Sequence, residues 1–408
     1  MQLAPWAVVL AGCGVDPPPL DGPPVVPAES LFVIAHFDDD MIFMQPELVD
    51  ALRSGSVTTV YVTSGDPKYG DARAERNFGA ARIAYTSVLG SSNFDCGYLL
   101  LDGSPIHHCR WTDRPVSLIG LDVPDGGRDG EYAISPLHLV EQSVTSVPIL
   151  GPVGGTATQD SIIDLLAAVI TETKPAEIHA LDLAANHGRD HSSHLFSSSF
   201  AFWGAARIGY QGMIHWHRGY NVDLEPATLG AADYEAAKTM LGYFEACYFD
   251  CARCGSSCTT LNAAHDTWLW RQYSSSRSPL DTLGTLTLEG APWWCVSVTG
   301  TGLGLADCAG ATQVQLDATG HLTVAGSCIA SAPDNAGPVV LEPCSNSPAQ
   351  YWLSDSEGHL WNGRPPGPTT NMDFDHVRCL SAELRPGAVV AAPICGAQLS
   401  PTWRFGSN

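Results

Sequence analysis

A short apolar run at residues 31–35 is followed directly by four side chains that could bind a metal or transfer a proton: His36, Asp38, Asp39 and Asp40. Apolar runs of this length are typical of buried parallel strands, and ligands of open α/β sheets bind beyond the carboxyl ends of such strands. Three adjacent carboxylates repel one another, so a bound cation would stabilise them. The stretch therefore predicts a divalent-metal site, against the alternative of an acidic turn whose aspartate caps the next helix.

A second histidine cluster strengthens the metal hypothesis. His191 and His194 follow Asp190 at the start of an apolar run that extends to Ile208 and is typical of a helix. Residues three apart lie on the same face of a helix. Both imidazoles can therefore point into one site.

Together, the two clusters resemble the PIG-L/LmbE family of zinc-dependent N-acetylglucosaminyl deacetylases. The family motifs read Ala-His-Pro-Asp-Asp-Glu and, commonly, Asp-His-Ser-Asp-His, where this chain has Ala-His-Phe-Asp-Asp-Asp at 35–40 and Asp-His-Ser-Ser-His at 190–194. The resemblance extends over about residues 31–273. Phe37, Asp40 and Ser193 depart from the family pattern, and none of them replaces a residue that the family uses as a ligand.

The resemblance implies how the metal is held and used. It makes His36, Asp39 and His194 the zinc ligands and Asp38 the general base. Three protein ligands with an open fourth position are typical of catalytic zinc, which lowers the pKa of bound water to about 7. Asp38 can then take a proton while an amide carbonyl is polarised. Other divalent metals are compatible with the same ligand types.

The resemblance also implies two contacts with the substrate. It makes His191, in its protonated form, the group that stabilises the oxyanion or assists the leaving group. It makes Arg76 a substrate contact, although Arg73 stands one helical turn earlier. The products would be acetate and a free amino sugar.

Alternating strand and helix patterns predict the scaffold for these residues. Residues 57–63 are β-branched and strand-like, and residues 72–89 are amphipathic and helical. Repeated alternation predicts an α/β fold, with a Rossmann-like parallel sheet and helices on both faces. The stretch 97–155 is rich in Gly and Pro and is expected to be an irregular insert that forms pocket walls or surface loops.

The last part of the chain carries an internal repeat. Pairs of a cysteine and a hydrophobic residue begin at Cys295, Cys328 and Cys379, and each is followed 13 to 16 residues later by a second cysteine. Three such repeats must close together to bury a core. Residues 290–408 resemble the ricin B-type β-trefoil lectins, whose repeats end in Gln-x-Trp, as at 350–352. The sugar-binding Asp of that family is absent from all three repeats, so glycan binding is an open question.

Cysteine usage predicts disulfide bonds. Twelve cysteines remain when Cys13 is set aside, and an even number in an exported chain favours disulfides. If each repeat is one structural unit, the pairs are Cys295 with Cys308, Cys328 with Cys344, and Cys379 with Cys395. Two disulfides or one four-thiolate metal site are both open for the cluster Cys247, Cys251, Cys254 and Cys258.

The N-terminus and the net charge set the expected location and partners. Residues 1–30 contain a short apolar run, then Cys13, then a Pro-rich tether, as in a bacterial lipoprotein signal that ends in a lipidated cysteine. An ordinary signal peptide with a Pro-rich linker is the alternative. The net charge of −23, from 43 acidic and 20 basic residues, argues against nucleic acids and anionic membrane surfaces as partners.

These observations give one functional hypothesis and two alternatives. The expected order is a signal and tether at 1–30, a deacetylase domain at 31–273, a linker at 274–289 and a β-trefoil at 290–408. The chain is expected to be an exported or cell-envelope hydrolase that uses Zn²⁺ to remove N-acetyl groups from N-acetylglucosamine-type sugars or glycans, with the trefoil as a possible glycan-binding part. A metallo-amidase for another acylated amine, or an inactive carbohydrate-binding protein, are the alternatives.

Overall fold

The structure is a computed structural model of the 408-residue chain. It describes residues 18–65, 71–128, 130–132, 134–140, 143–182, 190–223, 225–251, 254–277, 283–317, 320–333, 337–345, 347–350, 352–354, 358–362, 378–393 and 401–406. Cys13 of the predicted lipoprotein signal lies outside these ranges. Within them, no helix is both long enough and apolar enough to cross a membrane.

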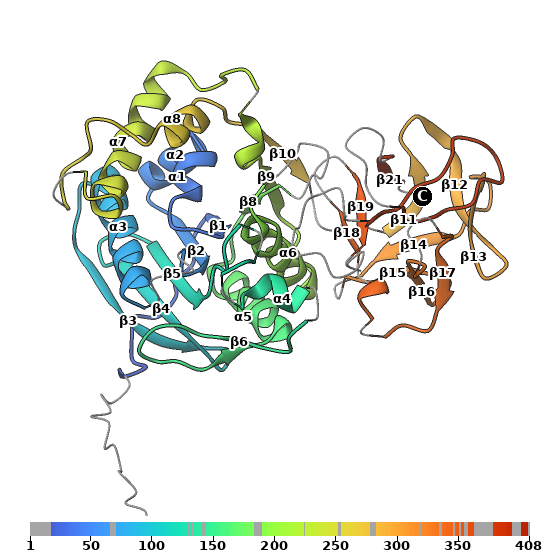
Figure 1. The fold of residues 1–408 in the computed structure, drawn as a ribbon, viewed down its shortest axis with the longest axis horizontal. Coiled ribbons are helices and arrows are strands. Elements are labelled where there is room, and N and C mark those ends of the chain that lie inside the picture. The colour runs from blue at the N-terminus through green and yellow to red at the C-terminus, as the bar shows by residue number, and fades with distance from the viewer. Residues whose placement is uncertain are drawn as a thin grey trace, which may run out of the picture.

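An eight-stranded sheet in the order β10-β9-β8-β1-β2-β5-β4-β3 organises the first unit (Figure 1). Its five central strands run parallel to their neighbours: β1 (Ser30–Ile34), β2 (Val57–Thr63), β5 (Val116–Val123), β8 (Glu177–Leu181) and β9 (Met213–His217). The remaining strands are antiparallel: β3 (Phe94–Leu101), β4 (Ser104–Trp111) and β10 (Ser274–Arg277). The sheet is therefore mixed, where the sequence predicts a parallel one.

Helices cover both faces of this sheet, as predicted. One face is buried under α1 (Asp39–Phe43), α2 (Glu47–Ser54), α3 (Asp71–Leu89), α7 (Ala231–Tyr248) and α8 (Ala263–Leu269). The other is buried under α4 (Pro136–Val140), α5 (Gln159–Thr173) and α6 (Ser192–Arg207). A short pair, β6 (Val147–Pro148) and β7 (Thr156–Ala157), and the 3₁₀ turn η2 (Tyr220–Val222) complete the unit.

Two segment boundaries differ from the sequence-based expectation. The stretch 97–155 is not an irregular insert, because it supplies β4 and the central strand β5. An Asp-Gly pair at 102–103 turns the chain between β3 and β4, both with positive φ, which is the usual chemistry of a tight hairpin. Residues 274–289 are not simply a linker either, since they contain β10 of the first sheet and the whole first strand of the next unit.

The second unit is β-rich and closes on itself. Seven strands form a ring through the pairing of the first with both the second and the fourth. They are β11 (Leu283–Leu288), β12 (Ala291–Thr299), β13 (Gly302–Asp307), β14 (Gln313–Leu316), β15 (Leu322–Val324), β16 (Ser327–Ala330) and β17 (Val340–Glu342). The other elements are η3 (Pro348–Gln350), β18 (Trp352–Ser354), β19 (Leu360–Asn362), β20 (Arg378–Cys379) and β21 (Trp403–Gly406).

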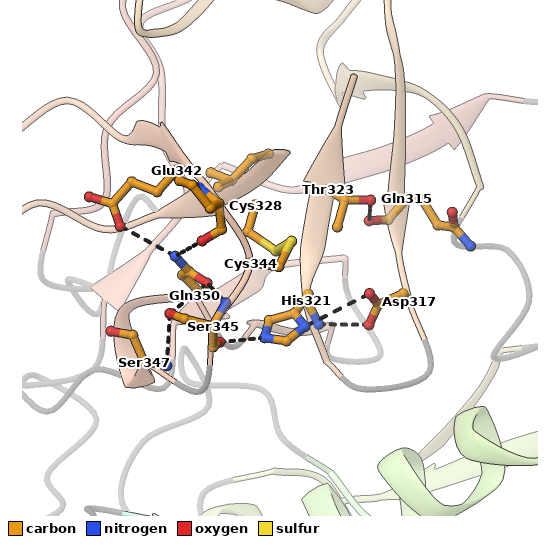
Figure 2. Close-up of a disulfide and its surroundings, with 12 residues drawn as sticks. Gln315, Asp317, His321, Thr323, Cys328, Glu342, Cys344, Ser345, Ser347 and Gln350 are labelled. Carbon is orange, nitrogen blue, oxygen red and sulfur yellow. Dashed lines mark hydrogen bonds and ion pairs between the residues drawn. A yellow bond between two sulfur atoms is a disulfide. The ribbon is translucent and has the colours of Figure 1, made fainter. Parts of the chain in front are cut away.

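The predicted internal repeat recurs as a repeated set of contacts. The indole N–H of Trp352 donates to the carbonyl of Ile329 at 2.7 Å, and that of Trp403 donates to the carbonyl of Leu380 at 2.7 Å, each across 23 residues. Figure 2 shows the glutamine of the Gln-x-Trp motif, Gln350, whose Oε1 accepts from the Ser345 backbone N–H at 2.8 Å beside a disulfide. The shared spacing of the two tryptophan contacts thus marks equivalent positions in the second and third repeats.

Disulfide bonds connect the predicted cysteines. Two of the repeat pairs form as expected, Cys295 with Cys308 and Cys328 with Cys344. Cys379 is also disulfide-bonded, and its expected partner Cys395 lies outside the described residues. The four-cysteine cluster forms two disulfides, Cys247–Cys254 and Cys251–Cys258, so the thiolate metal site is not realised, and a fifth bond links Cys96 with Cys109. These bonds indicate an oxidising environment.

The two units share one apolar cluster, which includes Trp203 of α6 and Leu322 of β15. Gly320 lies at this junction with φ +81°, and a Cβ there would come within 2.8 Å of the Trp203 Nε1 atom. Gly326 has nearly the same φ, +80°, but a Cβ at that position would meet no atom within 4 Å. Comparing substitutions at Gly320 and Gly326 therefore separates the effect of the contact with Trp203 from that of the left-handed backbone conformation.

We expect Gly320→Ala to lower the free energy of unfolding by about 2–5 kcal/mol, the sum of a left-handed backbone cost and an overpacking cost. Gly326→Ala carries only the backbone cost, about 1–2 kcal/mol. Urea unfolding of both variants measures the difference. Equal losses would mean that the contact with Trp203 is not tight.

Candidate metal centre

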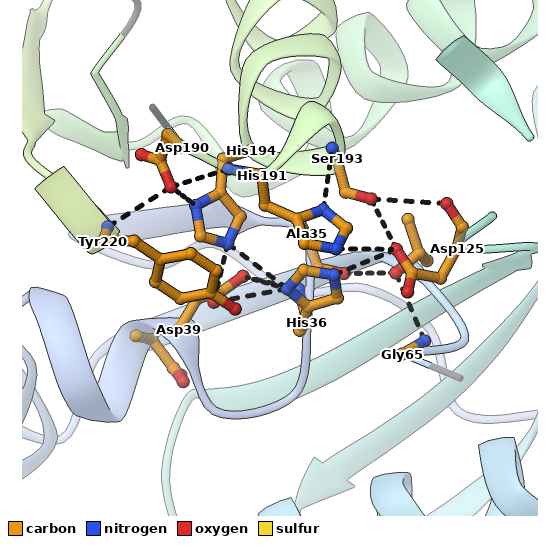
Figure 3. A network of polar contacts seen from close by, with 12 residues as sticks. Ala35, His36, Asp39, Gly65, Asp125, Asp190, His191, Ser193, His194 and Tyr220 are labelled. Atoms are coloured by element: carbon orange, nitrogen blue, oxygen red, sulfur yellow. Dashed lines mark hydrogen bonds and ion pairs between the residues drawn. The ribbon is translucent and has the colours of Figure 1, made fainter. Parts of the chain in front are cut away.

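The three residues expected to bind the metal converge at the carboxyl end of β1 (Figure 3). His36 Nδ1 lies 3.4 Å from Asp39 Oδ1 and 3.3 Å from His194 Nε2, and His194 Nε2 lies 3.1 Å from Asp39 Oδ1. A tetrahedral ion with ligand bonds of about 2.0–2.2 Å holds its ligands roughly 3.3–3.5 Å apart. The nearly equilateral triangle of ligand atoms fits such an ion.

Local structure explains why these atoms face one another. His36 lies two residues beyond the buried strand β1, and Asp39 is the first residue of α1. The His36 backbone N–H donates to Asp39 Oδ2 at 2.6 Å, which turns Oδ1 toward the histidines. His194 lies in the first turn of α6, where the His191 side chain acts as the N-cap. The turn after β1 thus supplies His36 and Asp39, and the start of α6 supplies His194.

A carboxylate orients each histidine through its second ring nitrogen. His194 Nδ1 lies 2.8 Å from Asp190 Oδ1, and His36 Nε2 lies 3.0 Å from Asp125 Oδ1. Asp190 Oδ1 is itself held by the backbone N–H groups of His191 at 2.8 Å and Tyr220 at 3.2 Å. Carboxylate–histidine pairs of this kind fix the tautomer and the ring orientation of metal ligands.

The carboxylates also raise the proton affinity of the histidines. Burial lowers the pKa of His194, but the charges of Asp39 and Asp190 outweigh burial and raise that pKa to about 9. His36 behaves in the same way, with Asp39 and Asp125 raising its pKa well above the usual value. Burial works against ionisation of Asp39, yet the two histidines hold the pKa of Asp39 well below its usual range. Protons therefore occupy the ligand triangle when no metal does.

Metal affinity should consequently rise with pH. Below pH of about 9 a metal ion must displace the proton of His194, so affinity falls by about tenfold for each pH unit and each displaced proton as the pH drops. Titrations with Zn²⁺ between pH 6 and pH 8, in buffers of different ionisation enthalpy, would count the released protons. A flat affinity over this range would contradict the assignment.

Asp38, the expected general base, lies outside the ligand triangle and lines a cavity. The cavity measures about 300 Å³ and is also lined by His36, His191 and Asp125. Aromatic side chains form much of the rest: Phe37, Tyr220, Phe244, Tyr248 and Phe249. Burial is the main cause that raises the pKa of Asp38, which suits a carboxylate that accepts a proton.

His191 lines the same cavity. Burial and the neighbouring His36 lower the pKa of His191 to about 3, which favours a neutral imidazole over the expected imidazolium. Its Nδ1 accepts a hydrogen bond from the Ser193 backbone N–H at 3.1 Å, which leaves the proton of a neutral ring on Nε2. This N–H can donate to an oxyanion.

Asp40, the third carboxylate of the motif, turns away from the metal. It is fully buried and accepts hydrogen bonds from Tyr85 Oη at 2.5 Å and Tyr61 Oη at 3.3 Å. Burial raises its pKa to about 8, so it is mostly neutral at pH 7. It links the start of α1 to Tyr61 of β2 and Tyr85 of α3.

The expected substrate contact Arg76 does not reach the cavity. Its Nη1 lies 3.7 Å from Asp250 Oδ2, and its side chain is 43% exposed. Arg73, one helical turn earlier, stacks on the ring of the cavity-lining Tyr248 at 4.0 Å. Arg76 is thus not among the residues that line the cavity, and Arg73 is the arginine of α3 that contacts a cavity-lining ring.

Sequence reasoning missed two groups in the site. Asp125 follows β5 at the same end of the sheet as His36, but β5 lies in the stretch expected to be irregular, so no predicted strand marked this carboxylate. His265 of α8 also lines the cavity, with Nδ1 2.8 Å from the buried Glu245 carboxylate. No local pattern marks His265, because α7 and α8 bring it there from far along the chain.

Comparisons with known proteins identify no family for the chain. No family model matches the sequence, and no curated protein matches it. The β-trefoil lectin of the Vibrio vulnificus hemolysin/cytolysin, solved with N-acetyl-D-lactosamine bound, is 17% identical with a TM-score of 0.25, over 30% of this chain and 93% of that chain. The agglutinin from Abrus precatorius is 15% identical with a TM-score of 0.24, over 33% of this chain and 51% of that chain.

A third solved structure matches over a larger share of the chain. The 4-carboxy-2-hydroxymuconate hydratase GalB from Pseudomonas putida is 14% identical with a TM-score of 0.32, over 54% of this chain and 83% of that chain. Similarities this low carry no function over to the present protein. Its chemistry has to be inferred from the residues of the site.

Proposed function

We propose that this protein is a metal-dependent hydrolase that removes N-acetyl groups from N-acetylglucosamine-type sugars or glycans. The ligand triangle of His36, Asp39 and His194 beside the separate carboxylate of Asp38 is the observation that carries the proposal. Two imidazoles and one carboxylate suit zinc, and a position left open to the cavity suits catalysis over a structural role. Other divalent metals fit the same ligands.

The residues of the site have different roles in the proposed amide hydrolysis. A bound metal would polarise the amide carbonyl and lower the pKa of a water. Asp38 takes the proton of the attacking water, and the Nε2–H of His191 donates to the developing oxyanion. Asp38 then returns the proton to the departing amine, which leaves acetate and a free amino sugar. Asp125 and Asp190 hold His36 and His194 in position throughout.

The walls of the cavity support a sugar as substrate. Aromatic rings can pack against the apolar faces of pyranose rings, and aromatic side chains line much of this cavity beside the polar groups of His36, Asp38 and His191. At about 300 Å³ the cavity is at the small end of ligand sites, which favours a single acetylated sugar unit at the metal.

Acetate release tests the metal, the reaction and the substrate together. The full chain, loaded with Zn²⁺, is incubated with N-acetylglucosamine, its oligomers and an N-acetylated glycan polymer, with and without chelator. Acetate that appears only without chelator supports the proposal. Release from simple acylated amines but from none of the sugars would favour a metallo-amidase, and no release from any substrate would favour a carbohydrate-binding protein.

For the C-terminal unit we propose a β-trefoil that packs on the catalytic unit, with at most weak glycan binding. The absence of an Asp after Cys295, Cys328 and Cys379 argues against the usual sugar contacts, and the apolar junction at Trp203 supports docking. Binding of the full chain to immobilised glycans, with the metal site blocked by His194→Ala, separates the two roles. Clear retention on the glycan would refute docking as the main role.

We further propose that the chain is exported and anchored through a lipid on Cys13. The disulfides fit an oxidising compartment, and the apolar run that ends at Cys13 fits a lipoprotein signal. Metabolic labelling with a fatty acid tests the anchor, and Cys13→Ser should abolish the label.

A further inference from the structure

A cluster of two histidines and a glutamate lies on β8 and β9, away from the metal centre at His36. Glu177 and His179 stand on one face of β8, and His215 stands beside His179 in the register of β9. The carboxylate of Glu177 and one nitrogen of each imidazole all lie within 4.8 Å of one another. Glu177 pairs with Ser30 and His179 with Phe32 of β1, whereas His36 follows the end of β1, so roughly 13–20 Å along the chain separates the two clusters.

His179 and His215 both point their Nε2 atom at the carboxylate of Glu177. His179 Nε2 lies 3.3 Å from Glu177 Oε1, and His215 Nε2 lies 3.2 Å from Glu177 Oε2. Ser30 Oγ donates to Glu177 Oε1 at 2.9 Å and so fixes the carboxylate. Each nitrogen–oxygen separation is close to the spacing of roughly 3.3–3.5 Å between ligands of a tetrahedral ion, and one oxygen and both Nε2 atoms lie within 4.8 Å of one another.

The second nitrogen of each imidazole is already occupied. His215 Nδ1 lies 2.8 Å from Ser276 Oγ, and His179 Nδ1 lies 3.0 Å from His217 Nε2. His179 is further held by stacking between Phe32, at 4.3 Å, and His215, at 4.8 Å. Both rings are thus oriented by outer partners in the way that metal-ligating histidines are.

The row of contacts from Phe43 through His217 and His179 to Glu177 has fewer hydrogens than contacts. His217 also donates a hydrogen bond to the backbone of Phe43. His217 Nε2 therefore accepts the Nδ1–H of His179. In this tautomer His179 Nε2 is a bare acceptor nitrogen, buried 3.3 Å from the Glu177 carboxylate, which cannot donate a hydrogen to it.

A cation between these groups would satisfy them together. An added proton on His179 would serve one pair of atoms, whereas a metal ion would serve Nε2 of both histidines and the carboxylate at once. The side chains of Glu177 and His215 are 40% and 24% exposed, so an ion can enter and a water can take a fourth position. We propose that Glu177, His179 and His215 bind a second divalent metal ion, of the zinc type, that ties β8 to β9.

Zinc counting on the full chain tests this site. The protein is stripped with chelator and titrated calorimetrically with Zn²⁺, and bound metal is measured by elemental analysis after desalting. His215→Phe keeps a ring stacked on His179 and removes the ligand atom, so it should bind one equivalent less than the unaltered chain. His107→Phe is the matched control, because His107 is also a stacked strand residue, 4.1 Å from the ring of Phe78, yet belongs to no such ligand group among the described residues.

The outcomes separate this site from the active site. His194→Ala should keep the equivalent that His215→Phe loses, and the double variant should lose both. If the centre at His36 binds no zinc, the difference between His215→Phe and the unaltered chain persists. Glu177→Gln provides a second test should His215→Phe fail to fold. Zinc counts for both variants equal to that of the unaltered chain would overturn the proposal and leave a proton between Glu177 and His179.

Discussion

Asp38→Asn is expected to keep the metal and to lower the turnover of N-acetylated sugar by about 10²–10⁴-fold, as for the loss of a general base. The reason is geometric: Asp38 lines the cavity, while the ligand triangle is complete without it. An asparagine has the same shape but cannot accept the proton of the attacking water. Acetate release at saturating substrate, together with the zinc content of each preparation, measures both parts of the prediction.

Asp40→Asn is the matched control, since it makes the same chemical change two residues along the chain. Asp40 is buried against Tyr61 and Tyr85, and its raised pKa of about 8 means that it is mostly uncharged at pH 7 already. Its replacement should therefore change turnover by no more than a few-fold. Equal losses in the two variants, or loss of metal from Asp38→Asn, would remove Asp38 from the role of base.

The sequence predicted those parts of the site that lie close together along the chain. His36 and Asp39 flank a strand end, and His194 lies in the first turn of a helix, so their positions follow from local structure. Asp125 could not be assigned, because its contact with His36 spans 89 residues and depends on β5, which falls in a stretch expected to be irregular. The β3–β4 hairpin was missed for the same reason.

Side-chain direction and protonation were beyond the reach of sequence patterns. Arg73 and Arg76 lie on one helix, and only tertiary packing shows that Arg73 stacks on Tyr248 while Arg76 pairs with Asp250. The neutral state of His191 is likewise a consequence of burial and of the nearby His36. Periodicity predicts the helix, but the environment of each side chain decides its chemistry.

The largest effect on metal binding is expected from His194→Ala. This change removes one of three ligands and leaves the carboxylates of Asp39 and Asp190 without the imidazole that both contact, at 3.1 Å and 2.8 Å. Two remaining ligands do not define a catalytic zinc site. We therefore expect the metal of this centre to be lost, and acetate release to fall to the level seen with chelator.

Asp190→Asn provides the graded comparison, because it keeps all three ligands and weakens only the orientation of His194. Loss of such an outer partner typically costs about 10- to 100-fold in metal affinity or activity. The order of zinc affinity should thus be the unaltered chain, then Asp190→Asn, then His194→Ala. Calorimetric titration in a His215→Phe background isolates this centre from the proposed second one. Since only His194→Ala removes a ligand atom, a His194→Ala protein that binds zinc as tightly as Asp190→Asn would mean that His194 does not bind the metal.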